Sequence, residues 1–430
     1  MLVASALIAV GCSNETPDSS RDSTATTTTS LSPATTEPQP EPAPINPEAT
    51  GQIAFIANTG DLMVINPDGT NPVSLTNHQD QRVSQPVWAP GGGALAWTEV
   101  GAEAELVVGS ADGRLETRAV TAVASFYTAW NESGTALALL GNADGGVGMS
   151  FAELEGGELT ASSSLDDAGT PYYFDWLGDD ELFAHVGGDI RRVSTNDPLG
   201  ESNEIGTAFQ APDVLSDGTV LIAEVSDGLT ELVRRDIASG ESTTLASYAG
   251  SAFFVVDPTE TRVAVHLPGG SASPPSTLVT TLRQPDNALL TGGVWVIDLE
   301  SGARVQAADT TRFAAFWDPT GTRLLMLEPS EGGTRWQVWA LDGSSIRTDS
   351  FLLSPVLFGS YLPFYDQYAK SITFWSPDGS SFVYSAMRES GVPAIFVHDA
   401  ATNGSSVAIA TGSVAIWSPT ASGAATESRL

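Results

Sequence analysis

The feature that most constrains the fold is a short pattern that returns along the chain. An aromatic or apolar residue is followed by a tight polar turn and a short apolar run, most clearly in FWSPDGSSFVY at 374–384. A repeat of about 42 residues in a β-rich chain indicates a β-propeller with one blade per repeat. The eight instances have Trp88, Trp130, Trp176, Val214, Val256, Trp317, Trp375 and Trp417 at the key position, with spacings of 42, 46, 38, 42, 61, 58 and 42 residues.

Each repeat also has a second half made of another apolar run, a polar turn and a short Thr/Ser-rich run. Residues 61–76, DLMVINPDGTNPVSLT, show it best. We therefore predict four strands per unit, from inside outward, with Asp-Gly and Ser-Gly turns because glycine accepts positive φ and aspartate bonds its own backbone. No amphipathic helix of useful length is expected.

The two ends of the chain predict how the ring closes. SVAIWSP, around Trp417, leaves no room for three further strands, whereas residues 52–76 supply three strands without an inner one. A blade built from both segments would remove the open sheet edges. We predict an eight-bladed, all-β propeller over 51–418. Seven blades is the alternative if a degenerate repeat near 176–215 forms no separate blade, and two smaller β domains is the alternative fold. The tryptophans would pack between blades.

The turn motifs resemble those of a known family. WSPDG at 375–379 and NPDGTNPVSLT at 66–76 are similar to the WD-repeat-like propeller repeats of the TolB family, and the resemblance extends over residues 51–418. It implies protein–protein interactions at the bacterial cell envelope, and it names no ligand.

The N-terminal segment predicts export and lipid attachment. The apolar run before Cys12 has the length of a signal-peptide core and is too short to span a bilayer. ALIAVGC resembles the bacterial lipobox, although Ala9 stands where leucine is preferred and the basic n-region is missing. We predict a signal peptide over 1–12, lipid on Cys12, a disordered Ser/Thr/Pro-rich tether over 13–50 that reaches on the order of 100 Å, and a disordered tail over 419–430.

The net charge of the chain limits the classes of partner that it can bind. The formal net charge is −34, from 52 acidic and 18 basic residues. Nucleic-acid binding needs a basic footprint, so it is excluded, and direct docking on anionic headgroups is disfavoured. We expect a monomer that meets the membrane only through its lipid.

Two spacings are longer than the repeat, and they locate two insertions, at 268–292 and 354–370. Both should emerge on the same face of the ring, where binding usually lies. The second insertion is the candidate surface for a ligand or partner, because tyrosine and phenylalanine suit peptide or sugar contacts. The alternative is a loop that buries its own rings against the propeller. The candidate residues are Phe358, Tyr361, Phe364, Tyr365, Asp366, Tyr368 and Lys370.

Catalysis finds little support in the sequence. There is no G-x-S-x-G elbow, and the single cysteine is assigned to the lipid. The four histidines, His78, His185, His266 and His398, are scattered, and the Asp-rich turns at 142–146 and 178–181 favour turn formation over calcium binding. We expect no catalytic residues, cofactor or metal site, although carboxylates paired in the central channel stay an open alternative. The expected function is a non-catalytic binding or scaffold protein. The alternative is an extracytoplasmic glycan-binding protein, hydrolase or lyase acting at the loop-bearing face.

Overall fold

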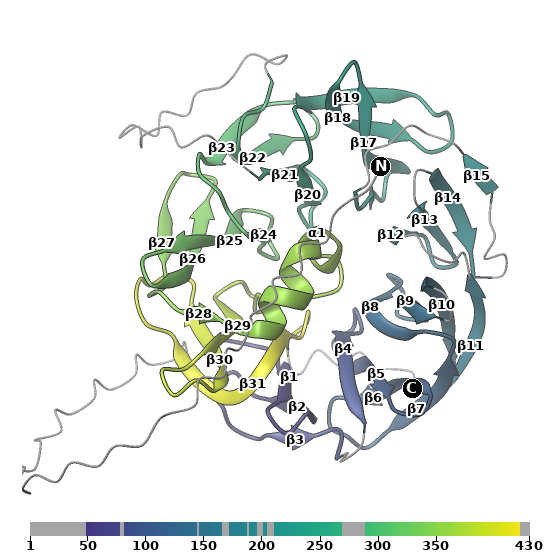
Figure 1. Cartoon of the computed structure of the whole chain (residues 1–430), viewed down its shortest axis with the longest axis vertical. Coiled ribbons are helices and arrows are strands. Elements are labelled where there is room, and N and C mark those ends of the chain that lie inside the picture. The colour runs from purple at the N-terminus through teal and green to yellow at the C-terminus, as the bar shows by residue number, and fades with distance from the viewer. Residues whose placement is uncertain are drawn as a thin grey trace, which may run out of the picture. The chain divides into compact units, whose positions relative to one another are not determined.

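The repeats form a ring of antiparallel sheets. The computed structural model describes residues 49–77, 81–143, 146–165, 172–186, 189–195, 201–203, 210–268 and 289–421. These residues make six four-stranded sheets and one seven-stranded sheet, which follow one another around a centre (Figure 1). Predictions for the signal peptide, Cys12, the tether over 13–48 and the tail over 422–430 lie outside the described residues.

Six blades consist of consecutive strands, numbered here in chain order. Blade 1 is β4 (Arg82–Trp88), β5 (Ala94–Val100), β6 (Ala104–Ser110) and β7 (Glu116–Thr121), and blade 2 is β8 (Ala124–Trp130), β9 (Ala136–Ala143), β10 (Gly146–Glu155) and β11 (Glu158–Leu165). Blade 3 is β12 (Tyr172–Leu177), β13 (Glu181–Val186), β14 (Asp189–Ser194) and β15 (Glu201–Asn203), and blade 4 is β16 (Asp213–Val214), β17 (Thr219–Ser226), β18 (Leu229–Asp236) and β19 (Ser242–Tyr248). Blade 5 is β20 (Phe253–Val256), β21 (Arg262–Leu267), β22 (Gly293–Asp298) and β23 (Arg304–Ala308), and blade 6 is β24 (Ala314–Trp317), β25 (Arg323–Ser330), β26 (Gly333–Ala340) and β27 (Ser345–Arg347).

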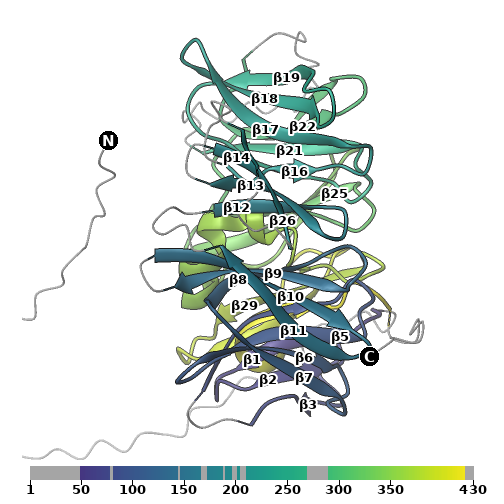
Figure 2. The ribbon, with the colours of Figure 1, turned by 90° about the vertical axis from the view of Figure 1, so that its right-hand side faces the viewer.

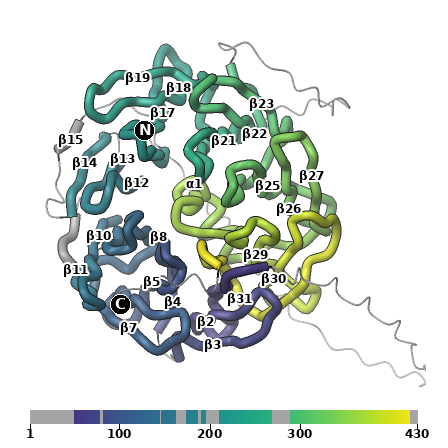
Figure 3. Tube along the Cα trace, turned by 180° about the vertical axis from the view of Figure 1, so that it is seen from behind, coloured from purple at the N-terminus to yellow at the C-terminus, as the bar shows by residue number. Residues whose placement is uncertain are grey.

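The seven-stranded sheet contains the last two blades, which share one long strand. Its order is β28 (Leu352–Leu353), β29 (Ser381–Met387), β30 (Pro393–Asp399), β31 (Val407–Trp417), β1 (Ile53–Ala57), β2 (Leu62–Ile65) and β3 (Val73–Ser74). The first half of β31 pairs with β30 as the outer strand of blade 7, and the second half pairs with β1, with Trp417 opposite Ile53. From behind, β1 and β31 lie side by side (Figure 3). The predicted eight blades and the closure by both chain ends are therefore confirmed.

The recurring tryptophans connect neighbouring blades by hydrogen bonds as well as by packing. In four blades the indole Nε1 donates to a backbone carbonyl in the inner strand of the preceding blade, at the residue just before the repeat's key position. The pairs are Trp88 to Ile416 (3.3 Å), Trp130 to Val87 (3.5 Å), Trp176 to Ala129 (3.4 Å) and Trp317 to Val255 (2.9 Å). Trp375 differs: its Nε1 has no hydrogen-bond partner, and the guanidinium of Arg323 lies 5.0 Å from its ring centre.

The inner strand of blade 7 is interrupted by the second insertion. Leu352 and Leu353 pair with one end of β29, and the strand resumes at Phe374, whose carbonyl accepts from the N–H of Val383. Between them, residues 354–373, which we call the plug, contain a π-helical turn (Leu357–Tyr361), a 3-10 turn (Leu362–Phe364) and α1 (Tyr365–Tyr368). The predicted insertion at 354–370 therefore interrupts the inner strand of blade 7, and its helical elements are short, with four residues in α1. None of the helices in the described part of the chain is long and apolar enough to cross a membrane.

Candidate functional site

The plug lies inside the ring, where it reaches the inner strands of blades 1 to 6. Figure 1 shows α1 near the centre, and the side view shows it between the sheets (Figure 2). Residues at i, i+4 and i+7 share one face of a helix, and the buried Leu357, Tyr361, Tyr365, Tyr368 and Ile372 follow this spacing. The plug therefore buries an apolar stripe inside the ring.

Gln367 fixes the plug to blade 3. Its Oε1 accepts from the N–H of Phe174 (3.0 Å), and its Nε2 donates to the carbonyl of the same residue (2.9 Å). The Gln367 side chain is buried. A buried backbone group needs a partner, and here one side chain supplies both partners that a neighbouring strand would give.

Lys370, the single lysine of the chain, holds the plug to blades 3 and 4. Its Nζ donates to Asp175 (2.8 Å), to Asp213 and to the carbonyl of Pro212 (2.6 Å). Burial opposes its charge, but the carboxylates of Asp175 and Asp213 outweigh burial and raise the pKa of Lys370 above its usual range. Burial raises the pKa of Asp213 to about 6, an effect that Lys370 partly offsets.

Two more titratable side chains are buried, Asp366 within the plug and His266 of β21 against it. Asp366 has one carboxylate oxygen without a hydrogen-bond partner, and burial, with a contribution from Asp213, raises its pKa to about 7. Nδ1 of His266 lies 2.9 Å from the hydroxyl of Tyr365, and burial lowers the pKa of His266 to about 4. At neutral pH the imidazole is therefore neutral, and Asp366 is poised near half ionisation.

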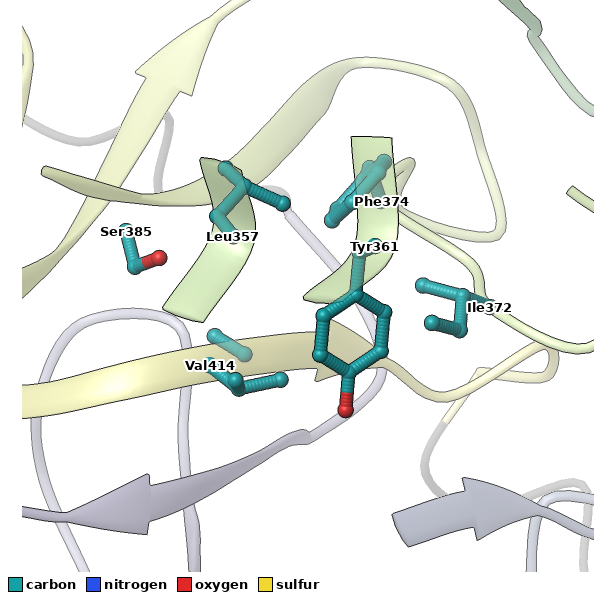
Figure 4. Close-up of a pocket in the computed structure, with 7 residues that line it drawn as sticks. Leu357, Tyr361, Ile372, Phe374, Ser385 and Val414 are labelled. Atoms are coloured by element: carbon teal, nitrogen blue, oxygen red, sulfur yellow. The ribbon is translucent and has the colours of Figure 1, made fainter. Parts of the chain in front are cut away.

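The plug is closely packed where it meets blades 7 and 8. Figure 4 shows plug residues Leu357, Tyr361 and Ile372 around a small cavity with Ser385 and Val414. The cavity measures about 10 Å³, which is near the lower limit for one water molecule. Close packing here makes the plug a fixed part of the fold.

A much larger pocket lies beside the plug, between it and blades 8, 1 and 2. Its volume is about 770 Å³, within the range of about 300–1,000 Å³ for ligand sites. Among the described residues that line it there is no aspartate or glutamate, and Arg82 is the only charged side chain. The lining residues are Ile56–Gly60, Gln81–Gln85, Val100, Ala124–Phe126, Asn142, Val356, Gly359–Tyr361, Phe364, Tyr368, Ser413 and Val414.

Three consecutive inner strands bulge toward this pocket. The pairing of inner and second strands shifts register at Gln85–Pro86 in blade 1, at Phe126 in blade 2 and at Ser413 in blade 8, and among the described strand pairs only these three inner strands do so. Bulges re-aim side chains and concentrate near functional sites. Gln85, Phe126 and Ser413 all line the pocket. Gln85 also has a φ of 52°, a left-handed conformation that costs about 1–3 kcal/mol and must be held by its surroundings.

Tyr368 connects the plug to the bulged strands. Its hydroxyl donates to the carbonyl of Phe126 and lies 3.4 Å from Nε2 of Gln85, which donates to it. The plug therefore supports two of the three bulges that shape the pocket wall.

The seven predicted surface residues do not form one surface. Tyr361, Tyr365, Asp366 and Tyr368 are buried, and the Lys370 side chain is only 12% exposed, because the plug occupies the channel instead of rising above it. Phe358 and Phe364 are 62% and 49% exposed. Of the seven, Tyr361, Phe364 and Tyr368 line the pocket. A ligand or partner surface in this segment stays a prediction. Phe364 is the exposed candidate residue that also lines the pocket.

Sequence reasoning missed Gln85, Phe126 and Gln367. The spacing of Leu357, Tyr361, Tyr365, Tyr368 and Ile372 was the available signal for a helical, inward-facing plug. His185, His266 and His398 are buried on β13, β21 and β30, and His78 lies outside the described residues. The described residues contain no group of three or more His, Cys, Asp or Glu that could hold a metal ion.

Comparisons with known proteins bear on the fold. No protein-family model and no curated protein matches this chain. A eukaryotic initiation factor is 12% identical with a TM-score of 0.54, covering 86% of this chain and 99% of that one. The dihydro-heme d1 dehydrogenase NirN is 11% identical with a TM-score of 0.54, covering 87% and 76%. TolB from Acinetobacter baumannii is 14% identical over 70% of this chain with a TM-score of 0.38, and the match spans 64% of its length. The predicted all-β propeller fold is confirmed by the ring of sheets, and the matches at these low identities concern the fold alone.

Proposed function

We propose that this protein is a non-catalytic binding protein that takes its ligand at the pocket beside the plug. The observation that carries the proposal is the convergence of three bulged inner strands and the plug on one pocket of about 770 Å³. A ligand site needs concave walls with a few placed polar groups. The ring supplies rigid walls, and the plug supplies an exposed aromatic ring at Phe364.

A photo-crosslinking experiment tests whether the pocket is the binding site. A photoreactive residue placed at position 364 of the full chain should capture a ligand or partner from cell-envelope extracts, and the same group at position 358 should not. Phe358 is the matched control, because it is an exposed phenylalanine of the same plug that does not line the pocket. Equal capture at both positions, or at neither, would contradict a site at the pocket.

The location belongs to the proposal as well. We place the ring outside the cytoplasmic membrane of a bacterium, held by lipid on Cys12 through the segment 13–50. The supporting observations are the apolar run that ends at the chain's single cysteine and the Ser/Thr/Pro-rich composition that follows. Cys12→Ser should move the protein from the membrane fraction to the soluble fraction or medium, with Ser13→Ala as control. Unchanged membrane retention would refute the anchor.

A further inference from the structure

The described lining of the pocket mixes apolar and polar side chains and is almost uncharged, in a chain that is otherwise strongly acidic. The chain has 52 acidic residues, and none of those that the structure describes lines the pocket. A site for a basic peptide would carry carboxylates, because opposite charge steers and orients such a ligand. A site for a polyanion would need several cations, whereas Arg82 is the one cation among the described lining residues, in a chain with a net charge of −34.

The polar groups present are amides and hydroxyls. Asn58, Gln81 and Asn142 contribute side-chain amides, which both donate and accept hydrogen bonds, and Ser84 and Ser360 contribute hydroxyls, which do the same. All five are at least partly exposed. Ligand hydroxyls also donate and accept, so groups with both capacities match them better than fixed charges do.

Two partly exposed phenylalanine rings also belong to the lining. Phe126 is 38% exposed and comes from a bulge of blade 2, and Phe364 is 49% exposed and comes from the plug. Covering a partly exposed aromatic ring with a ligand is favourable, because it removes apolar surface from water. A sugar ring offers a C–H face to such a phenylalanine and hydroxyls at its edge to the amides.

Shape and rigidity favour a small ligand over a folded protein. A stable protein interface buries about 800 Å² on each partner, usually on an open surface, whereas this site is a concavity of about 770 Å³. Gln85 is held in its left-handed conformation at the bulge, and its amide donates to Tyr368. Walls that are already ordered lower the entropic cost of binding.

From these observations we propose that the pocket binds a neutral carbohydrate chain, with Phe126 and Phe364 as the apolar contacts and the amides of Asn58, Gln81 and Asn142 as hydrogen-bonding groups. The inference rests on the proposed function, because it names the ligand class of the same site.

The test is calorimetric titration of the full chain with a panel of probes. The panel holds neutral trisaccharides of glucose, galactose and mannose, the trisaccharide of galacturonic acid, and uncharged hexapeptides. We expect at least one neutral trisaccharide to bind with one site per chain. Phe126→Ala and Phe364→Ala should each weaken that binding about tenfold. Phe358→Ala, outside the pocket lining, should stay within about twofold, and all three variants should unfold at the wild-type temperature.

Several results would overturn the inference. These are no binding of any neutral sugar by folded protein, unchanged affinity in the two phenylalanine variants that line the pocket, or preferred binding of the galacturonic acid trisaccharide with loss in Arg82→Gln. The photoreactive group at position 364 separates the two proposals. If it captures a polypeptide whose capture Phe126→Ala abolishes, the carbohydrate inference fails and the binding site stands. If neither sugar nor polypeptide depends on the pocket residues, both proposals fail.

Discussion

The plug meets the ring in two different ways. Toward blades 3 and 4 it is sealed, because Gln367 pairs with both backbone groups of Phe174 and Lys370 forms ion pairs with Asp175 and Asp213. Toward blades 8, 1 and 2 it leaves a pocket of about 770 Å³, with Phe364 half exposed.

This difference shows how one inserted segment can serve stability and binding together. The sealed side uses charge and paired hydrogen bonds, which hold a segment in one place at the cost of taking polar groups out of water. The open side uses neutral amides and rings, which leave room for a ligand. We therefore expect substitutions on the sealed side to change the free energy of unfolding, and substitutions on the open side to change binding.

The largest effect should come from Lys370→Met. The substitution leaves Asp175 and Asp213 without their cation in a largely buried site, and removing one partner of a buried ion pair costs about 3–5 kcal/mol. Urea unfolding of the full chain measures it, with Arg82→Met at an exposed pocket position as control, expected within about 0.5 kcal/mol. A loss below about 1 kcal/mol would mean that the sealed side does not depend on charge.

Gln367→Ala should have the next largest effect. It leaves the N–H and carbonyl of Phe174 without their partners, and each unsatisfied buried group costs about 1–3 kcal/mol. We expect the free energy of unfolding to fall by about 2–3 kcal/mol and limited proteolysis to cut within 354–373. Gln81→Ala, at the pocket, is the matched control and should change neither. An equal loss of unfolding free energy in Gln367→Ala and Gln81→Ala would contradict the proposed difference between the sealed side and the open side.

Asp366 should make the sealed side sensitive to pH. Its pKa is raised by burial to about 7 in the folded protein, above the value of about 3.9 for an unfolded chain. Between these values the folded state binds more protons than the unfolded state, so stability is fully present below about pH 4 and is lost as pH rises through about 7.

Wild type and Asp366→Asn should therefore differ in the slope of unfolding free energy against pH. We expect wild type to lose about 3–4 kcal/mol relative to the variant from pH 4 to pH 8, at about 1.4 kcal/mol for each pKa unit between the folded and unfolded values. His266, whose pKa burial lowers to about 4, is present in both proteins and largely cancels from the difference. Parallel curves of unfolding free energy against pH would show that ionising Asp366 does not destabilise the folded protein.

Tyr368→Phe should have the smallest effect, about 1 kcal/mol, because it removes one hydroxyl that donates to Phe126 and accepts from Gln85. Tyr361→Phe is the control, since its ring packs 4.7 Å from that of Tyr368 and no other described side chain is bonded to its hydroxyl; we expect a change below about 0.5 kcal/mol. Because the lost hydroxyl supports two bulges, amide exchange at residues 84–87 and 125–127 should rise only in Tyr368→Phe.

The fold could be predicted because each blade has its own short sequence motif, and these motifs repeat along the chain. Each turn and each key tryptophan, from Trp88 to Trp417, predicts one blade. The absence of an inner strand at residues 52–76 predicts that the C-terminal strand closes the ring. The site could not be predicted in the same way. Gln85 and Phe126 lie in the runs RVSQPVW and ASFYTAW, and their bulges depend on pairing with the next strand.

The plug was the hardest part to predict. Its aromatic residues are equally compatible with an exposed surface and with a buried one, and the choice depends on the channel that eight blades leave at their centre. The one lysine in the chain pairs with Asp175 and Asp213, which lie 195 and 157 residues away. No local pattern connects residues so far apart.

The sharing of β31 by two blades has a consequence for the order of assembly. During synthesis β1, β2 and β3 emerge first, yet their inner neighbour, Val414–Trp417, emerges last. Until then the free side of β1 is an unpaired edge, which can recruit strands of other molecules. We expect that a nascent chain stopped before residue 407 would leave both blade 7 and blade 8 incomplete, so that protection of these polypeptides from aggregation would depend on chaperones until translation finishes.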